Sequence, residues 1–244
     1  MPGKTLCLLV VLFVSTGVFA GSGTHWGYSG DDGPDYWAGL SPEYSACAGK
    51  NQSPINLTGF IDADLAPIKF HYYKDAVDIV NNGHTVQVNF DQRSNIDIDG
   101  ATFNLLQYHF HAPSENRING KSYPLEAHFV HSDRDGNLVV IALMFEEGAE
   151  NKSLTKVWEH LPQREGDRLA LPAVISAGEL LPQQHDYYRY DGSLTTPPCT
   201  EGVRWLVMKE PVSASKKQIE ALVRVMPHPN NRPVQPANAR EVLK

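Results

Sequence analysis

Three histidines, His109, His111 and His128, have the residue type and spacing that fit a metal site in this 244-residue chain. His109 and His111 are two positions apart, and a β-strand places such residues on one face because its side chains alternate between faces. His128 lies in a second alternating segment, residues 125–130. Two neighbouring strands could therefore aim three imidazoles at one point. Three neutral nitrogens bind Zn²⁺ and leave the fourth tetrahedral position open, as in catalytic zinc sites.

Each segment also carries a polar residue that could fix its histidine. Gln107 lies two residues before His109, and Glu126 lies two before His128, so both share the expected ligand face. Such groups accept the second ring N–H of a ligand and hold its tautomer. The opposite face of the first segment is expected to be apolar, with Leu106, Tyr108 and Phe110. The pattern alone leaves ordinary core histidines as an alternative, because periodicity does not show that the two strands pair.

Strand signals dominate the part of the chain that must position these histidines. Alternating or apolar runs predict strands at residues 76–79, 85–90, 96–98, 101–111, 125–131, 138–145 and 203–208. Asp99-Gly100 is a strong hairpin signal between two of them. Helical spacing appears only at residues 154–161 and 219–226, the second with Ser213 or Ser215 as N-cap. The expected fold is mainly β: a single domain with a mostly antiparallel sheet and a few peripheral helices.

Five separated motifs carry a resemblance to a known family. They are QSPINL (52–57), NNGH (81–84), HFHAPSE (109–115), SLTTPPCTEG (193–202) and NRPVQ (231–235). Together they resemble the α-class carbonic anhydrases, of the bacterial exported type, from about Trp26 to Gln235. One departure is visible, since Asn116 follows the Ser-Glu pair where the family usually has His. That position is not a zinc ligand in the family, so the departure puts in question only the support of the Glu115 loop.

The resemblance implies a twisted central sheet with zinc at the floor of a cone-shaped cleft. It implies an enzyme that uses Zn²⁺ for the reversible hydration of carbon dioxide to bicarbonate and a proton, by attack of zinc-bound hydroxide on CO₂. Sulfonamides and anions would inhibit it. A non-catalytic relative is a weaker alternative, because all three ligand histidines are present. Another zinc hydrolase is a second alternative, although the chain has no His-Glu-x-x-His motif of a peptidase.

The resemblance also implies roles for residues that the pattern alone would not single out. Glu115 would accept the hydroxyl hydrogen of Thr195, which then orients the hydroxide. His84 would export the proton. Residues matching the positions that order water between metal and shuttle are Tyr28, Asn82 and Gln87. Residues matching the CO₂ pocket are Val130, Val140, Leu194, Thr195, Thr196, Val203 and Trp205. Without the family, these residues would be interpreted as surface, turn or core positions.

The N-terminus resembles a secretory signal peptide. Lys4 supplies a positive start, residues 6–13 form an apolar run, and Val18-Phe19-Ala20 offers a small-x-small cleavage site. We expect residues 1–20 to be removed and residues 21–244 to form the catalytic domain, exported to the periplasm or secreted. The apolar run is too short for a comfortable membrane span, so no membrane span is expected after cleavage. An uncleaved anchor is the alternative.

Cleavage would leave two cysteines, Cys47 and Cys199. Two cysteines in an exported chain suggest one disulfide, and the resemblance to bacterial members implies the same pair. Two buried thiols are the alternative. The chain has 28 Asp and Glu against 21 Lys and Arg, without a basic patch interleaved with aromatics, so nucleic acid is not an expected partner. A homodimer stays open, because the sequence does not decide the oligomeric state.

Overall fold

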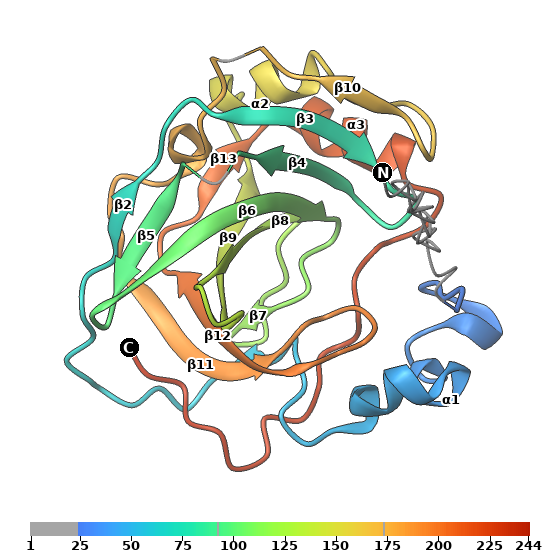
Figure 1. Cartoon of the computed structure of the whole chain (residues 1–244), viewed down its shortest axis with the longest axis vertical. Helices are drawn as coiled ribbons and strands as arrows, with labels where there is room; N and C mark the ends of the chain where they lie inside the picture. Colours follow the sequence, from blue (N-terminus) through green and yellow to red (C-terminus); the bar gives the residue numbers. More distant parts are fainter. Residues whose placement is uncertain (1–23, 92, 173) are drawn as a thin grey trace, which may run out of the picture.

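The computed structural model describes residues 24–91, 93–172 and 174–244. The expected signal peptide, residues 1–20, lies outside these ranges. The described chain is built around one large twisted sheet with a few helices at its margins (Figure 1). This confirms the expected mainly β fold. None of the helices in the described ranges has the length and apolar character needed to cross a bilayer.

The large sheet contains 11 strands and is mostly antiparallel. Its main path runs in the order β10 (Arg168–Ala170), β3 (Ala76–Asn81), β4 (Val86–Phe90), β6 (Ala101–His111), β8 (Leu125–Ser132), β9 (Leu138–Glu147), β12 (Glu201–Met208) and β11 (Tyr187–Ser193). Beside this path, β5 (Asn95–Ile98) pairs with β6 and with β2 (Lys69–His71), and β13 (Val212–Ala214) pairs with β9. Only the β12–β9 and β13–β9 pairings of this sheet are parallel within the described residues.

The remaining elements are short. Strands β1 (Asn56–Leu57) and β7 (Arg117–Ile118) form a small parallel pair. The α-helices are α1 (Trp37–Leu40), α2 (Lys152–Trp158) and α3 (Lys216–Val225), and the 3₁₀ helices are η1 (Gly30–Asp32), η2 (Pro42–Ala48) and η3 (Ala177–Leu180). Ser215 is the N-cap of α3, because its hydroxyl accepts from the backbone of Gln218 while the Gln218 side chain accepts from Ser215.

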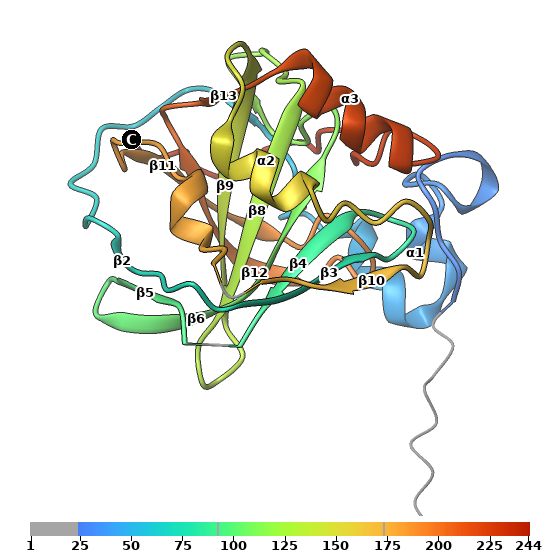
Figure 2. The same cartoon turned by 90° about the horizontal axis from the view of Figure 1, so that it is seen from above.

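One face of the sheet carries the main hydrophobic core. Helices α2 and α3 lie side by side against this face (Figures 1 and 2). The Trp158 ring of α2 packs edge-on against Phe110 of β6 at 4.8 Å between ring centroids. Because alternate residues of β6 point to opposite faces, burying Phe110 here leaves its neighbours His109 and His111 on the other face.

A β-bulge corrects one expectation about this strand. The pairing of β6 with β8 shifts register between Leu105 and Gln107. Leu105 is therefore the residue that joins Tyr108 and Phe110 in the core, whereas Leu106 is only partly buried. The expectation that Leu106 shares the apolar face was wrong, because strict alternation cannot anticipate an inserted residue. The bulge lies before His109, so the ligand spacing is unaffected.

The expected disulfide is present. Cys47 and Cys199 are bridged, with 4.9 Å between their Cα atoms and a sequence separation of 152 residues. The guanidinium of Arg232 donates to the carbonyl oxygen of Cys47, and the side chain of Gln52 donates to that of Cys199. The bridge thus ties the N-terminal segment to the loop between β11 and β12, which carries Thr195.

Reduction of this bridge is expected to lower the free energy of unfolding. Chain-entropy arithmetic for so long a loop gives an upper figure of about 5 kcal/mol. Denaturant unfolding of the mature protein, with and without reductant, measures the change. Thiol titration of the denatured but unreduced protein is the control, and two free thiols would show that no bridge forms in solution.

Candidate functional site

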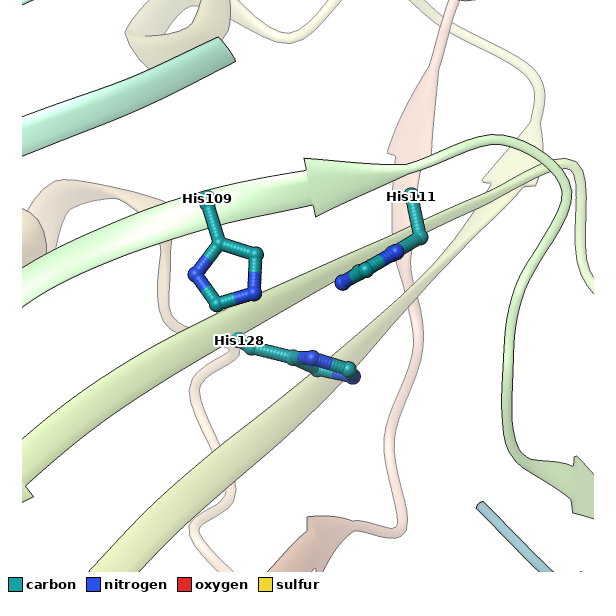
Figure 3. A group of neighbouring side chains, drawn as sticks. All are labelled: His109, His111 and His128. Carbon is teal, nitrogen blue, oxygen red and sulfur yellow. The ribbon is translucent and has the colours of Figure 1, made fainter. Parts of the chain in front are cut away.

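Three histidines meet on the face of the sheet opposite the main core. His109 and His111 come from β6, and His128 comes from the neighbouring strand β8 (Figure 3). His109 and His128 are directly opposite each other in the β6–β8 register. One ring nitrogen from each of the three histidines lies within 4.8 Å of the others. The pairing that the sequence pattern could not demonstrate therefore exists.

Hydrogen bonds fix the orientation of all three rings. The Nδ1 of His109 bonds to Oε1 of Gln107 at 2.8 Å, and the Nε2 of His128 bonds to Oε1 of Glu126 at 2.8 Å. The Nδ1 of His111 bonds to the backbone oxygen of Asn230 at 2.6 Å. Because each of these partners accepts, the bonded nitrogen carries the proton. The other nitrogens, Nε2 of His109, Nε2 of His111 and Nδ1 of His128, are left as lone-pair donors.

These three nitrogens fit a zinc ion. Nε2 of His111 is buried and has no hydrogen-bond partner among the described residues, which is costly unless a ligand satisfies it. Burial lowers the pKa of His109, His111 and His128, the first and last well below the usual value. The imidazoles are therefore neutral at neutral pH, which is the form that binds a metal. Three neutral nitrogens with one position left open match a catalytic zinc site.

Asn116 stands where the family that the chain resembles usually has His, and it forms hydrogen bonds within this site. Glu126 accepts from the backbone N–H groups of Glu115 and Asn116 through Oε2, and from the Asn116 side chain through Oε1. The side-chain oxygen of Asn116 accepts in turn from the Tyr190 hydroxyl at 2.9 Å. One carboxylate thus holds both a ligand histidine and the Glu115 loop, and Asn116 supports that loop.

Glu126→Gln is expected to reduce zinc affinity or activity by about 10- to 100-fold, the usual effect of losing the hydrogen-bond partner of a metal ligand. The hydrogen bonds that the structure gives to the Glu126 carboxylate all come from N–H donors. A glutamine at this position would point its side-chain N–H₂ at one of these donors instead of accepting from it. Zinc content after dialysis against a chelator and the rate of the reaction measure the loss. Glu159→Gln, on the exposed end of α2, is the matched control. An unchanged zinc affinity in Glu126→Gln would contradict the orienting role of Glu126.

Glu115 lies beside the histidines. Oε2 of Glu115 is 3.6 Å from Nε2 of His111 and 3.8 Å from Nδ1 of His128. Its Oε1 accepts from the backbone N–H of Arg232 at 2.8 Å. Burial raises the pKa of Glu115 well above the usual value, while the neighbouring Thr195 side chain and the Arg232 backbone N–H act against this rise. A cation held by the histidines would favour the ionised carboxylate further.

An apolar cluster lies next to the histidines on the same face. Trp205 packs edge-on against His128 with 4.8 Å between ring centroids, and its indole N–H donates to the backbone oxygen of Ser193. The expected pocket residues that belong to this cluster are Val130, Val140, Leu194, Val203 and Trp205. Thr196 lies on the same loop as Thr195 and accepts from the backbone N–H of Cys199 through its own backbone oxygen.

His84 lies in a different environment from the three ligands. Its imidazole stacks on the indole of Trp26 at 3.8 Å between ring centroids. Tyr28 is edge-on to it at 6.5 Å, and burial together with the charge of Glu115 raises the pKa of Tyr28 well above the usual value. Burial is the main cause that lowers the pKa of His84, followed by the charge of His25, while Glu165 acts in the opposite direction.

The other two residues expected near His84 make local contacts. The side-chain oxygen of Asn82 accepts from the backbone N–H groups of His84 and Thr85, which fixes the turn. Gln87 pairs with His109 across β4 and β6, and its amide donates to Asn89. Gln87 is thus next to the ligands, and Asn82 holds the turn that presents His84.

Two functional residues were missed by reasoning from the sequence. Asn230 orients His111, and its side chain also donates to the backbone oxygens of His84 and Phe110. Arg232 is buried and joins the disulfide segment to Glu115. The NRPVQ motif at residues 231–235 marks this segment, but no spacing rule connects it to strands more than 100 residues earlier.

Known proteins are similar to this chain in both sequence and fold. A family model described as eukaryotic-type carbonic anhydrase matches residues 32–244. A carbonic anhydrase of Pectobacterium carotovorum is 48% identical over the full length of both chains. A carbonic anhydrase of Neisseria gonorrhoeae is 44% identical, covering 100% of this chain and 97% of its own length. The solved structure of α-carbonic anhydrase from Thermovibrio ammonificans with the inhibitor sulfanilamide is 54% identical, covers 91% of this chain and all of that one, and has a TM-score of 0.90.

Proposed function

The chain belongs to the eukaryotic-type, or α-class, carbonic anhydrase family, and we propose from this premise how its own residues carry out the reversible hydration of carbon dioxide. The observation that carries the proposal is the meeting of three oriented imidazoles with one free nitrogen each. Bound there, Zn²⁺ would lower the pKa of a water molecule to about 7 and supply hydroxide at neutral pH. Stopped-flow measurement of CO₂ hydration, before and after zinc removal, tests the proposal.

Thr195 and Glu115 are proposed to orient the attacking group. Glu115 is held from two sides, by the backbone of Arg232 at its carboxylate and by Glu126 at its own backbone N–H. As a carboxylate it can only accept, so the Thr195 hydroxyl must donate to it. The Thr195 oxygen is then left as an acceptor toward the open position at the metal centre. Fixing that direction favours a near-attack geometry.

The apolar cluster beside His128 is proposed to receive carbon dioxide. CO₂ is uncharged and only weakly polar, so it partitions into a pocket without hydrogen-bond donors better than bicarbonate does. The walls would come from Val130, Val140, Leu194, Val203 and Trp205, with Thr195 and Thr196 at the polar end. The backbone N–H of Thr195 would contact an oxygen of bicarbonate.

His84 is proposed to carry the proton away from the metal centre. A group with a pKa near 7 releases protons directly to water at roughly 10³ s⁻¹. This rate is the product of the diffusion-limited protonation rate constant, about 10¹⁰ M⁻¹s⁻¹, and the acid dissociation constant, about 10⁻⁷ M. The fastest enzymes of this chemistry turn over near 10⁶ s⁻¹, so fast turnover needs a relay. An imidazole suits this role because its usual pKa is about 6.5. Tyr28, Asn82 and Gln87 would order the water between the two sites.

His84→Ala is expected to lower kcat at low buffer concentration by about 10-fold or more, because only proton export depends on the imidazole. The ratio kcat/KM should be nearly unchanged, since the CO₂ step does not use His84. Added imidazole should restore much of the lost rate. An unchanged kcat at low buffer would show that another group carries the proton.

The family resemblance also supports proposals about export of the protein and about its inhibitors. We propose that residues 1–20 are a cleaved signal peptide and that residues 21–244 form the single catalytic domain, located in the periplasm or secreted. The Cys47–Cys199 bridge supports this, since disulfides persist in oxidising compartments. Aromatic sulfonamides are proposed to inhibit by binding the metal as anions, supported by the sulfanilamide complex of the Thermovibrio relative.

A further inference from the structure

A cavity of about 270 Å³ lies beside His84. Trp26 and Tyr28 form its aromatic wall. The titratable side chains that line it, apart from His84 and Tyr28, are His25, Asp32, Glu165 and His228. His25 and Asp32 pair with each other at 3.0 Å. Among the described residues, no salt bridge involves Glu165, so its carboxylate is an unpaired negative charge of this cavity.

The chain holds Glu165 against the turn that presents His84. Gly166 donates to the backbone oxygen of Asn81 at 2.8 Å, and Asn81 donates to the backbone oxygen of Asp167 at 3.0 Å. The carboxyl carbon of Glu165 is only 2.8 Å from where a Cβ on Gly83 would stand. Gly83 has φ +84°, a backbone conformation that favours glycine. The absence of a Cβ at this position also leaves room for the Glu165 carboxylate.

The surroundings of His84 otherwise disfavour its charged form. Its ring is half-buried against Trp26, and burial lowers its pKa, as does the charge of His25 when that residue is protonated. A shuttle that binds its proton too weakly cannot take it from a donor with a pKa near 7. Glu165 acts in the opposite direction on the pKa of His84.

We propose that Glu165 is a positioning residue for proton export, whose carboxylate stabilises the imidazolium form of His84 on the adjacent turn. The inference rests on the shuttle role proposed for His84. The proton comes from the metal centre, resides on the imidazole while Glu165 balances its charge, and leaves to a buffer base. Among the described residues, no hydrogen bond or salt bridge joins Glu165 to His109, His111 or His128, so its proposed action is through His84.

The test is titration of the His84 imidazole by NMR in the zinc-loaded protein, with its signal assigned through His84→Ala. At low salt, Glu165→Gln should lower its proton affinity about threefold, the effect of one charge several ångströms away in water. Glu165→Lys should lower it about ninefold, since the charge changes by two units and the factor is squared. Both differences should shrink at 0.5 M salt, where screening is strong. Glu159→Lys, the same charge change in the α2–α3 groove, should leave the titration unchanged.

The rate should follow the titration. At low buffer, kcat should fall in the order wild type, Glu165→Gln, Glu165→Lys, with kcat/KM unchanged and with recovery on addition of imidazole. An unchanged His84 titration in Glu165→Lys would overturn the inference while leaving the shuttle proposal intact. If the titration shifts but neither His84→Ala nor Glu165→Lys slows kcat, the shuttle proposal fails, and a role for Glu165 in proton export fails with it.

Discussion

His128→Ala is expected to abolish CO₂ hydration and to release zinc. The substitution removes one of the three nitrogens that converge on the site, and two nitrogens cannot hold the open tetrahedral geometry. It also deprives Oε1 of Glu126 of one donor, which leaves a buried carboxylate less well compensated. Metal analysis after dialysis measures zinc retention, and stopped-flow mixing with CO₂ measures the rate.

His131→Gln is the matched control for this substitution. His131 lies three residues further along β8, and its ring bonds to the Tyr72 hydroxyl at 2.6 Å on the side away from the ligands. The control removes a buried histidine from the same strand, so it should retain zinc and activity even where it costs stability. Hydration by a zinc-free His128→Ala protein would contradict the assignment of the metal site.

Thr195→Ala is expected to keep the fold and the zinc but to slow hydration by roughly a factor of 100, the scale of one lost preorganised hydrogen bond. The substitution removes the hydroxyl proposed to donate to Glu115, and with it the group proposed to orient the attacking hydroxide. The measurement is kcat/KM for CO₂ at constant zinc content.

Two further variants make the Thr195 experiment specific. Thr195→Ser keeps the hydroxyl and should recover most of the rate. Thr196→Ala changes the next residue of the same loop. It should have a smaller effect, because the proposed mechanism does not use a hydrogen bond from the Thr196 side chain to Glu115. A wild-type rate in Thr195→Ala would mean that the attacking group is oriented in another way.

The sequence could predict the ligand face because a strand has a period of two. That period places His109 and His111 together, and it also places Gln107 and Glu126 where they bond to ligand rings. It could not show that β6 and β8 pair, and it placed Leu106 wrongly, since a bulge breaks the alternation. Periodicity describes each strand by itself, whereas pairing is set by contacts between distant segments.

Residues near the C-terminus could not be predicted from pattern for the same reason. Asn230 is 119 positions from His111, whose ring it orients, and Arg232 is 117 positions from Glu115. Both lie outside regular strands and helices, so no periodicity constrains them. The short edge strand β10 was also missed, because its three residues are all exposed and show no alternation. Only the resemblance to a family marked residues 231–235 before the structure placed their contacts.

Zinc titration of the metal-free protein tests the central claim most directly. Zinc would be removed with a chelator, and CO₂ hydration would be followed by stopped flow as Zn²⁺ is returned in steps. We expect no activity without metal, a linear recovery, and saturation at one zinc per chain, with no recovery in His128→Ala. Full hydration activity in the metal-free protein, or equal recovery in His128→Ala, would contradict the account.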